Sequence, residues 1–143
     1  CYATENKSFA SLAELMLKEA GYEVWLDDQK VSVGDEWRRS IDDGISAADV
    51  VLVVLTPESC ESKYVTYEWA FALGQRKRVV PLLVREAQIH PRLAVLQHLD
   101  FTNKKTMPWE RLFQEIDASE TGVPTTPEEP GVEATSNEPS EVM

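Results

Sequence analysis

The sequence predicts an α/β fold in which a parallel sheet carries helices on both faces. Segments with helical and with strand patterns alternate along residues 7–117. Two strand segments, 50–55 and 79–84, are nearly continuous runs of valine and leucine, which is typical of strands that helices cover on both faces. Strict alternation favours a parallel sheet, and right-handed crossovers then leave a flavodoxin-like winding as the economical topology.

The helices are predicted from apolar residues that recur three and four positions apart. Pro81 cannot donate a backbone hydrogen bond, so we expect its strand to be bulged or near a sheet edge. The predicted elements, in chain order, are a helix at 7–20, a strand at 23–26, a helix after Asp35 with Trp37, Ile41, Ile45 and Ala48 on its buried side, a strand at 50–55, a helix at 61–75 with Val65, Trp69, Ala72 and Leu73 as its core side, a strand at 79–84, a short strand at 99–101 and a helix at 108–117.

The order of these elements predicts that a piece is missing upstream. The first predicted element is a helix, whereas in such a fold the strand before it normally lies in the middle of the sheet. We therefore expect the first strand to be absent and the ladder of a central strand to be unpaired where that strand would lie.

Residues 118–143 differ in composition from the rest of the chain. They hold six glutamates and neither Lys nor Arg, and their Pro, Glu, Thr and Ser residues offer almost nothing to bury. We predict one domain at 1–117 and a disordered acidic tail or linker at 118–143.

Charge and hydropathy exclude several classes of partner. The net charge is −11; without the acidic tail it is −5, from 14 basic and 19 acidic residues. A weakly acidic body does not favour nucleic acid. No apolar run approaches the ~18–20 residues that cross a bilayer, so no membrane partner is expected. The absence of a signal peptide and the two cysteines, Cys1 and Cys60, fit a cytoplasmic protein without a disulfide framework.

Ligands of doubly wound sheets bind beyond the carboxyl ends of the strands, and three segments are expected there: 1–3, 27–34 and 56–62. None has a Gly-rich phosphate loop, and a Gly-x-Ser-x-Gly elbow is also lacking. His90 and His98, without paired cysteines, do not make a metal-ligand pattern, so no metal site is predicted.

The helix at 61–75 carries the most suggestive group. Tyr64 and Glu68 are four residues apart and share a face, and Ser62 in the first turn can cap the helix or meet a ligand. A carboxylate beside an aromatic plane suits a flat cationic ligand attached to a sugar. Spacing alone favours the alternative in which Glu68 is an exposed helix glutamate and Tyr64 a packing residue.

Five segments, in order and in register over roughly 1–117, resemble bacterial TIR (Toll/interleukin-1 receptor) domains. Tyr2–Lys7 resembles their first loop and Gly21–Asp27 their second strand. The other three are Gly34–Trp37 with Ile41 and Ile45, which resembles the following loop and helix, Asp49–Pro57, which resembles the third strand, and Ser62–Ala70, which resembles the helix that bears the family's catalytic glutamate.

The resemblance implies a five-stranded parallel sheet and an NAD⁺ glycohydrolase that releases nicotinamide and ADP-ribose, linear or cyclised, in bacterial signalling or defence. NAD⁺ would be a substrate and no cofactor is implied. The implied partners are other TIR domains, through self-association, and further domains of a longer chain. The implied site residues are Glu68 as the catalytic glutamate, Tyr64 in an aromatic position that is often Trp, and Tyr2, Ala3, Asp27 and Lys30 near the nucleotide. Ser62 joins the predicted substrate-binding residues because of its place in the first turn of the helix.

Two other functions remain open on the sequence. TIR domains also act as non-catalytic adaptors that bind one another through the second-strand loop and neighbouring helices. A nucleoside deoxyribosyltransferase-like enzyme shares the fold style and a single glutamate, although the second-strand loop matches TIR domains better.

Overall fold

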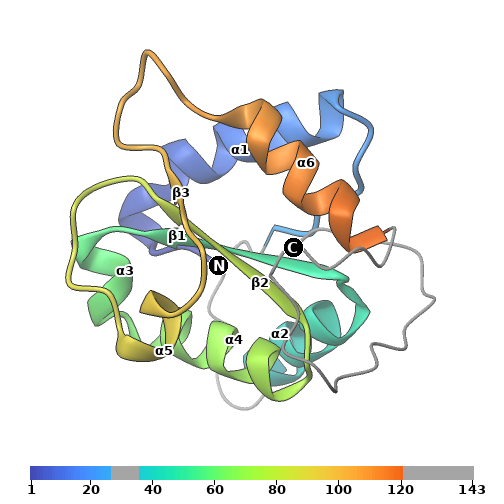
Figure 1. The fold of residues 1–143 in the computed structure, drawn as a ribbon. Coiled ribbons are helices and arrows are strands. Elements are labelled where there is room, and N and C mark those ends of the chain that lie inside the picture. The colour runs from blue at the N-terminus through green and yellow to red at the C-terminus, as the bar shows by residue number, and fades with distance from the viewer. Residues whose placement is uncertain (27–35, 121–143) are drawn as a thin grey trace, which may run out of the picture.

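The computed structural model describes residues 1–26 and 36–120 as three parallel strands flanked by helices (Figure 1). The strands form one sheet in the order β1-β2-β3. Helices α1 and α6 lie on one face of this sheet, and α2 and α4 on the other (Figure 1). The elements are η1 Thr4–Asn6, α1 Lys7–Glu19, α2 Glu36–Ala47, β1 Val50–Leu55, α3 Pro57–Glu61, α4 Lys63–Gly74, β2 Arg78–Leu83, α5 Pro91–Ala94, β3 Leu99–Asp100 and α6 Trp109–Glu120. The predicted fold class is confirmed.

Strand β1 lies beside β2 at one end of the strand order, and its six residues are all buried. It pairs in parallel with β2 in unbroken register, from Val50 opposite Arg78 to Leu55 opposite Leu83. Valine-rich strands suit this place, because β-branched side chains pack well on a surface that helices cover on both sides.

Pro81 lies inside β2, opposite Val53, without a bulge. The amide of Val84 donates to the carbonyl of Leu55 on β1. Because the backbone groups of successive residues in a strand point to opposite sides, those of Pro81 and Leu83 point away from β1. There β3 pairs only with Leu82 and Leu83. Of the two expectations, the bulge is wrong, whereas the edge position holds locally: the nitrogen of Pro81 faces the side of β2 on which β3 has not yet begun, so no ladder bond is lost.

Each face of the sheet has its own apolar cluster. On one side Ile41 and Ile45 of α2 pack with Val65, Trp69 and Ala72 of α4; Ala48 and the predicted stripe of α4 are buried too, except that Leu73 is only half-buried. On the other side the cluster joins α1, α6 and the strands through Leu17, Phe101, Leu112 and Ile116. The helical stripes are therefore confirmed where side chains are described; Trp37 lies outside those residues.

The unpaired ladder that the sequence predicts is partly filled by Cys1. Its amino nitrogen donates to the carbonyl of Leu52 at 2.7 Å, and its carbonyl accepts from the amide of Val54 at 2.8 Å. These residues of β1 face away from β2, so β1 has a backbone partner on both sides.

Three further boundaries differ from the prediction. Residues 23–26 do not form a strand, and Val24 alone makes an isolated bridge. A strand exists only where it pairs with another, and the pattern of this segment does not specify a partner. The helix predicted at 61–75 is two helices, since Ser62 is extended between α3 and α4. Helix α6 continues to Glu120, three residues into the predicted tail. Residues 121–143 lie outside the described residues.

Within the described part of the chain, every helix is too short or too polar to span a bilayer.

Candidate active site at the carboxyl edge of the sheet

Helix α4 starts at the carboxyl edge of β1 and is set by Ser62. The backbone of Ser62 is extended (φ −73°, ψ 122°), and its hydroxyl accepts from the amide of Val65 at 3.3 Å. Its carbonyl accepts from the hydroxyl of Thr66 at 2.9 Å. Of the two roles predicted for the Ser62 hydroxyl, the helix cap is observed; contact with a ligand stays a prediction.

Glu68 lies in the second turn of α4 and has no exposed surface, whereas Tyr64 one turn earlier is 43% exposed. The alternative favoured by spacing alone, an exposed glutamate behind a packing tyrosine, is therefore wrong on both counts. Fully buried glutamates are rare, because removing a carboxylate from water is costly.

The burial of Glu68 was readable from the sequence. The buried residues of α4 are Val65, Glu68, Trp69 and Ala72, which follow the i, i+3, i+4, i+7 pattern of a core-facing stripe. Glu68 thus occupies a position at which this helix otherwise places an apolar residue. Once Val65, Trp69 and Ala72 are assigned to the core, the same spacing predicts that Glu68 is buried with them.

The first loop reaches the same edge of the sheet. Because Cys1 pairs with β1, the chain carries Tyr2 and Ala3 toward the carboxyl end of that strand, and both are 3% exposed. Tyr2 packs with Ala10 and Val54 in a small cluster of its own. Tyr2 and Ala3 therefore lie at the predicted edge as buried residues. Asp27 and Lys30 lie outside the described residues.

A buried polar contact joins this loop to the turn that follows β1. The hydroxyl of Thr56 donates to Oδ1 of Asn6 at 2.7 Å, and both residues are buried. Thr56 and Ser59 also form a reciprocal capping box at the start of α3. Asn6 was missed by the sequence analysis: an Asn directly before a predicted helix indicates an N-cap, whereas the Asn6 side chain makes no cap hydrogen bond and accepts from Thr56 instead.

A second polar contact at this edge is the ion pair between Arg85, which follows β2, and Glu58 of α3. The guanidinium hydrogen bond, helped by a backbone hydrogen bond and the Thr56 side chain, lowers the pKa of Glu58 to about 2. Arg85 was also missed, because nothing in the sequence connects it with a residue 27 positions earlier.

The residues on either side of Glu68 have separate contacts. The hydroxyl of Tyr67 donates to Oδ1 of Asp42 on α2 at 2.6 Å, and this hydrogen bond raises the pKa of Tyr67 because the carboxylate stabilises the protonated phenol. Trp69 is 5% exposed and its ring lies 5.1 Å from that of His90. The two aromatic residues next to Glu68 in the sequence are thus each held by another part of the chain, Tyr67 by Asp42 and Trp69 beside His90.

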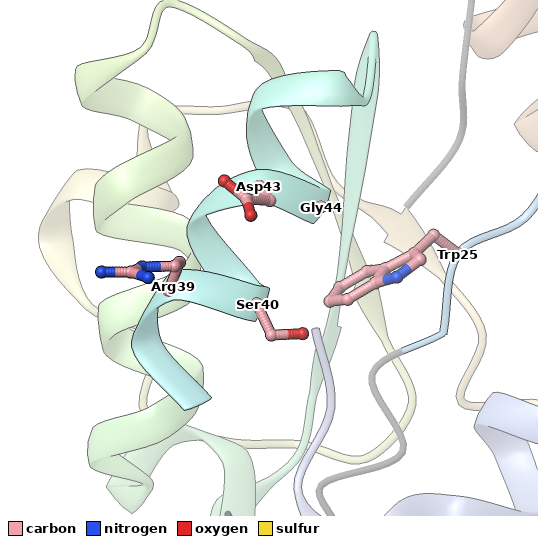
Figure 2. A pocket seen from close by; sticks show the side chains of 5 residues that line it. All are labelled: Trp25, Arg39, Ser40, Asp43 and Gly44. Atoms are coloured by element: carbon pink, nitrogen blue, oxygen red, sulfur yellow. The ribbon is translucent and has the colours of Figure 1, made fainter. Parts of the chain in front are cut away.

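An open groove of about 580 Å³ lies apart from these residues, between Trp25 and α2. Figure 2 shows the indole of Trp25 facing Ser40 and Gly44, with the side chains of Arg39 and Asp43 turned away from it. A Cβ on Gly44 would lie 2.8 Å from the indole, so the ring seats on α2 only because residue 44 is glycine. Of the predicted site residues that the structure describes, none lines this groove.

The fold and the edge together define a class: a parallel α/β domain with a fully buried carboxylate, that of Glu68, on the helix that begins near the carboxyl end of β1. Within this class the chain belongs to the TIR domain family, whose model matches residues 1–116. Among solved structures, it resembles the TIR domain of the Toll-related receptor TRR-2 from Hydra magnipapillata, with a TM-score of 0.72, 22% identity, and coverage of 82% of this chain and 94% of the other. That likeness supports the fold.

Sequence relatives include enzymes that act on NAD⁺. The chain is 35% identical over 69 residues to the 2′ cyclic ADP-D-ribose synthase BtTIR of Bacteroides thetaiotaomicron, covering 47% of this chain and 24% of the relative. It is 38% identical over 66 residues to the NAD(+) hydrolase TcpA of Theionarchaea archaeon (strain DG-70-1), covering 45% and 20%. It is 31% identical over 86 residues to the NAD(+) hydrolase PdTIR of Paracoccus denitrificans (strain Pd 1222), covering 57% and 29%. The matches span less than a third of the length of each relative.

Proposed function

We propose that this TIR domain cleaves the N-glycosidic bond of NAD⁺, releasing nicotinamide and an ADP-ribose product, with Glu68 as the catalytic carboxylate. The observation that carries the proposal is the complete burial of Glu68 in the stripe of α4, at the sheet edge where ligands of such folds bind. A buried carboxylate with no packing advantage over an apolar residue is a candidate functional group.

The chemistry needs only one carboxylate. Ordinary glycosides use two carboxyl groups because the leaving group must be protonated. The nicotinamide of NAD⁺ is already positively charged and leaves as a neutral molecule, so a general acid is unnecessary. A single carboxylate that holds the ribose and stabilises the developing oxocarbenium charge is sufficient.

The relatives support this choice of substrate, since their names include both NAD(+) hydrolases and 2′ cyclic ADP-D-ribose synthases. Both linear and cyclic products fit one mechanism, in which either water or a hydroxyl of the same molecule captures the ribose carbon. In the proposal Tyr64 stacks on the ligand, and Ser62, Tyr2 and Ala3 line its path. Because Glu68 has no exposed surface, the side chains that cover it must move before the ribose can reach it.

The test is nicotinamide release from NAD⁺ by concentrated protein, measured by chromatography. Glu68→Gln should abolish release, because the amide keeps the shape of the side chain but not its charge. Glu61→Gln, at an exposed glutamate of α3, is the matched control and should retain the parent rate. Release at the parent rate by Glu68→Gln refutes the proposed role.

The second candidate is an adaptor that binds other TIR domains without catalysis. The open groove beside Trp25 favours it, since a cleft on the surface of α2 is a feature that a partner can fill. An adaptor releases no nicotinamide at any concentration, and its self-association, measured by sedimentation, is unchanged by Glu68→Gln.

A further inference from the structure

Helices α2 and α4 pack against each other on the face of the sheet that carries Glu68. The contact is largely apolar and involves Ile41 and Ile45 from α2 with Val65 and Trp69 from α4. Apolar burial is strong but non-directional. It holds the two helices together, and it specifies the rotation of α4 about its own axis less sharply than a hydrogen bond would.

A directional contact between these helices is the hydrogen bond from Tyr67 to Asp42, 2.6 Å long and half-buried. Hydrogen bonds to charged acceptors are about twice as strong as those between neutral groups. The raised pKa of Tyr67 keeps its phenol protonated as the donor. The Tyr67 ring also stacks on Phe71 one turn further along α4, with centroids 6.1 Å apart and planes 16° apart, so the phenol points along a defined line to α2.

Tyr67 and Glu68 are successive residues, so their side chains leave α4 about 100° apart. Tyr67 therefore reaches α2 while Glu68 faces the interior. A carboxylate lies roughly 6 Å from the helix axis, so a rotation of α4 by about 10° displaces it by about 1 Å. Misplacement of a reacting group by about 1 Å can reduce the rate by about 100-fold.

We propose that Tyr67 and Asp42 form a positioning pair that fixes the rotation of α4 and thereby the direction of the Glu68 carboxylate. Neither residue needs to touch the substrate. The effect on the reaction rate rests on the proposed NAD⁺ cleavage, whereas the effect on Glu68 itself does not.

Tyr67→Phe removes only the hydroxyl, and it should lower kcat for nicotinamide release about tenfold or more, with KM changed less than about twofold. Asp42→Ala should reproduce that loss. Asp42→Asn keeps an acceptor oxygen in place, and it should restore kcat to within about threefold of the parent. A merely structural contact would not produce this rescue together with a change confined to kcat.

The chain supplies a matched control in Tyr22, whose hydroxyl bonds to Asp117 of α6 on the opposite face of the sheet. Tyr22→Phe removes the same group from the same kind of pair, and it should leave kcat at the parent value. If Tyr22→Phe and Tyr67→Phe lower kcat equally, the role is general stability and the proposal is overturned.

A readout without turnover separates this inference from the proposed function. In protein labelled with ¹³C at the glutamate carboxyl carbons, the Glu68 resonance is identified by its loss in Glu68→Gln. It should move in Tyr67→Phe and stay in place in Asp42→Asn and Tyr22→Phe. If the parent releases no nicotinamide, the proposed function fails, and the position of this resonance alone then tests the positioning pair. An unmoved resonance in Tyr67→Phe overturns the positioning pair.

Discussion

Replacing Gly44 and Gly74 by alanine applies one chemical change to two helical sites with opposite surroundings. At Gly74 a new Cβ meets nothing within 4 Å, whereas at Gly44 it lies 2.8 Å from three ring atoms of Trp25. In a helix interior alanine is favoured over glycine by about 0.8–1 kcal/mol. Gly74 is the last residue of α4, where this preference is weaker than in the interior, so Gly74→Ala should stabilise the protein by less than about 1 kcal/mol.

Gly44 lies inside α2, where the propensity gain is at least as large as at Gly74, so a lower stability of Gly44→Ala must come from the clash with Trp25. The indole must tilt away by more than half an ångström to reach ordinary contact, and overpacking of this kind costs about 1–3 kcal/mol. Gly44→Ala should therefore be less stable than Gly74→Ala by about 1–3 kcal/mol. For a domain of this size that corresponds to roughly 3–12 °C in Tm.

The assay is urea unfolding of the two variants and the parent, followed by far-UV circular dichroism, with thermal melts as a second measurement. Equal slopes with different midpoints would show that stability alone has changed. If Gly44→Ala is as stable as Gly74→Ala, then Trp25 does not rest on α2 as the structure has it, and the account of the groove in Figure 2 is wrong.

Two further predictions concern side chains outside the proposed site. Arg76 has a left-handed backbone (φ 58°) just after the end of α4, a conformation that glycine adopts without strain. Arg76→Gly should therefore stabilise the protein by about 0.5–1 kcal/mol in urea unfolding, and Arg76→Ala should not. Equal urea midpoints for the two variants would contradict this. The pKa of Glu58 is lowered from 4.5 to about 2, so the ion pair with Arg85 adds stability above about pH 4.5 that is lost as pH falls toward 2. Arg85→Gln should therefore have a lower urea midpoint than the parent at pH 6, and the gap should narrow between pH 4.5 and 3; a gap independent of pH would refute it.

The elements that the sequence predicts well are those whose burial is periodic. The run Val50–Leu55 and the stripe of Ile41, Ile45 and Ala48 report contact with a core through their own spacing, and both are buried as expected. The segment 23–26 fails because its four residues carry no information about a pairing partner. The sequence also does not predict the extended Ser62 that separates α3 from α4, where one residue is both the C-cap of α3 and the N-cap of α4.

For the site, the sequence supplies which residues share a helix and, through the stripe of α4, which side of that helix is buried, but not which residues of other elements face them. Tyr64 and Glu68 are four apart, yet one is 43% exposed and the other fully buried, because the surface of α4 changes from solvent to core within one turn. The contacts from Tyr67 to Asp42 and from Thr56 to Asn6 join residues 25 and 50 positions apart. Such contacts follow from packing of whole elements and leave no local pattern.

The stripe of α4 also supplies a test of why Glu68 is there. Proteins often retain a destabilising group where function requires it. If Glu68 serves catalysis, Glu68→Met, which fills a similar volume with apolar atoms beside Val65 and Trp69, should abolish nicotinamide release and leave the urea midpoint equal to or above that of the parent. If the carboxylate is instead a structural anchor for its neighbours, the same substitution strands their polar groups and lowers stability by about 1 kcal/mol or more. The sign of the midpoint change, measured on a variant that cannot turn over, therefore distinguishes a catalytic glutamate from a structural one.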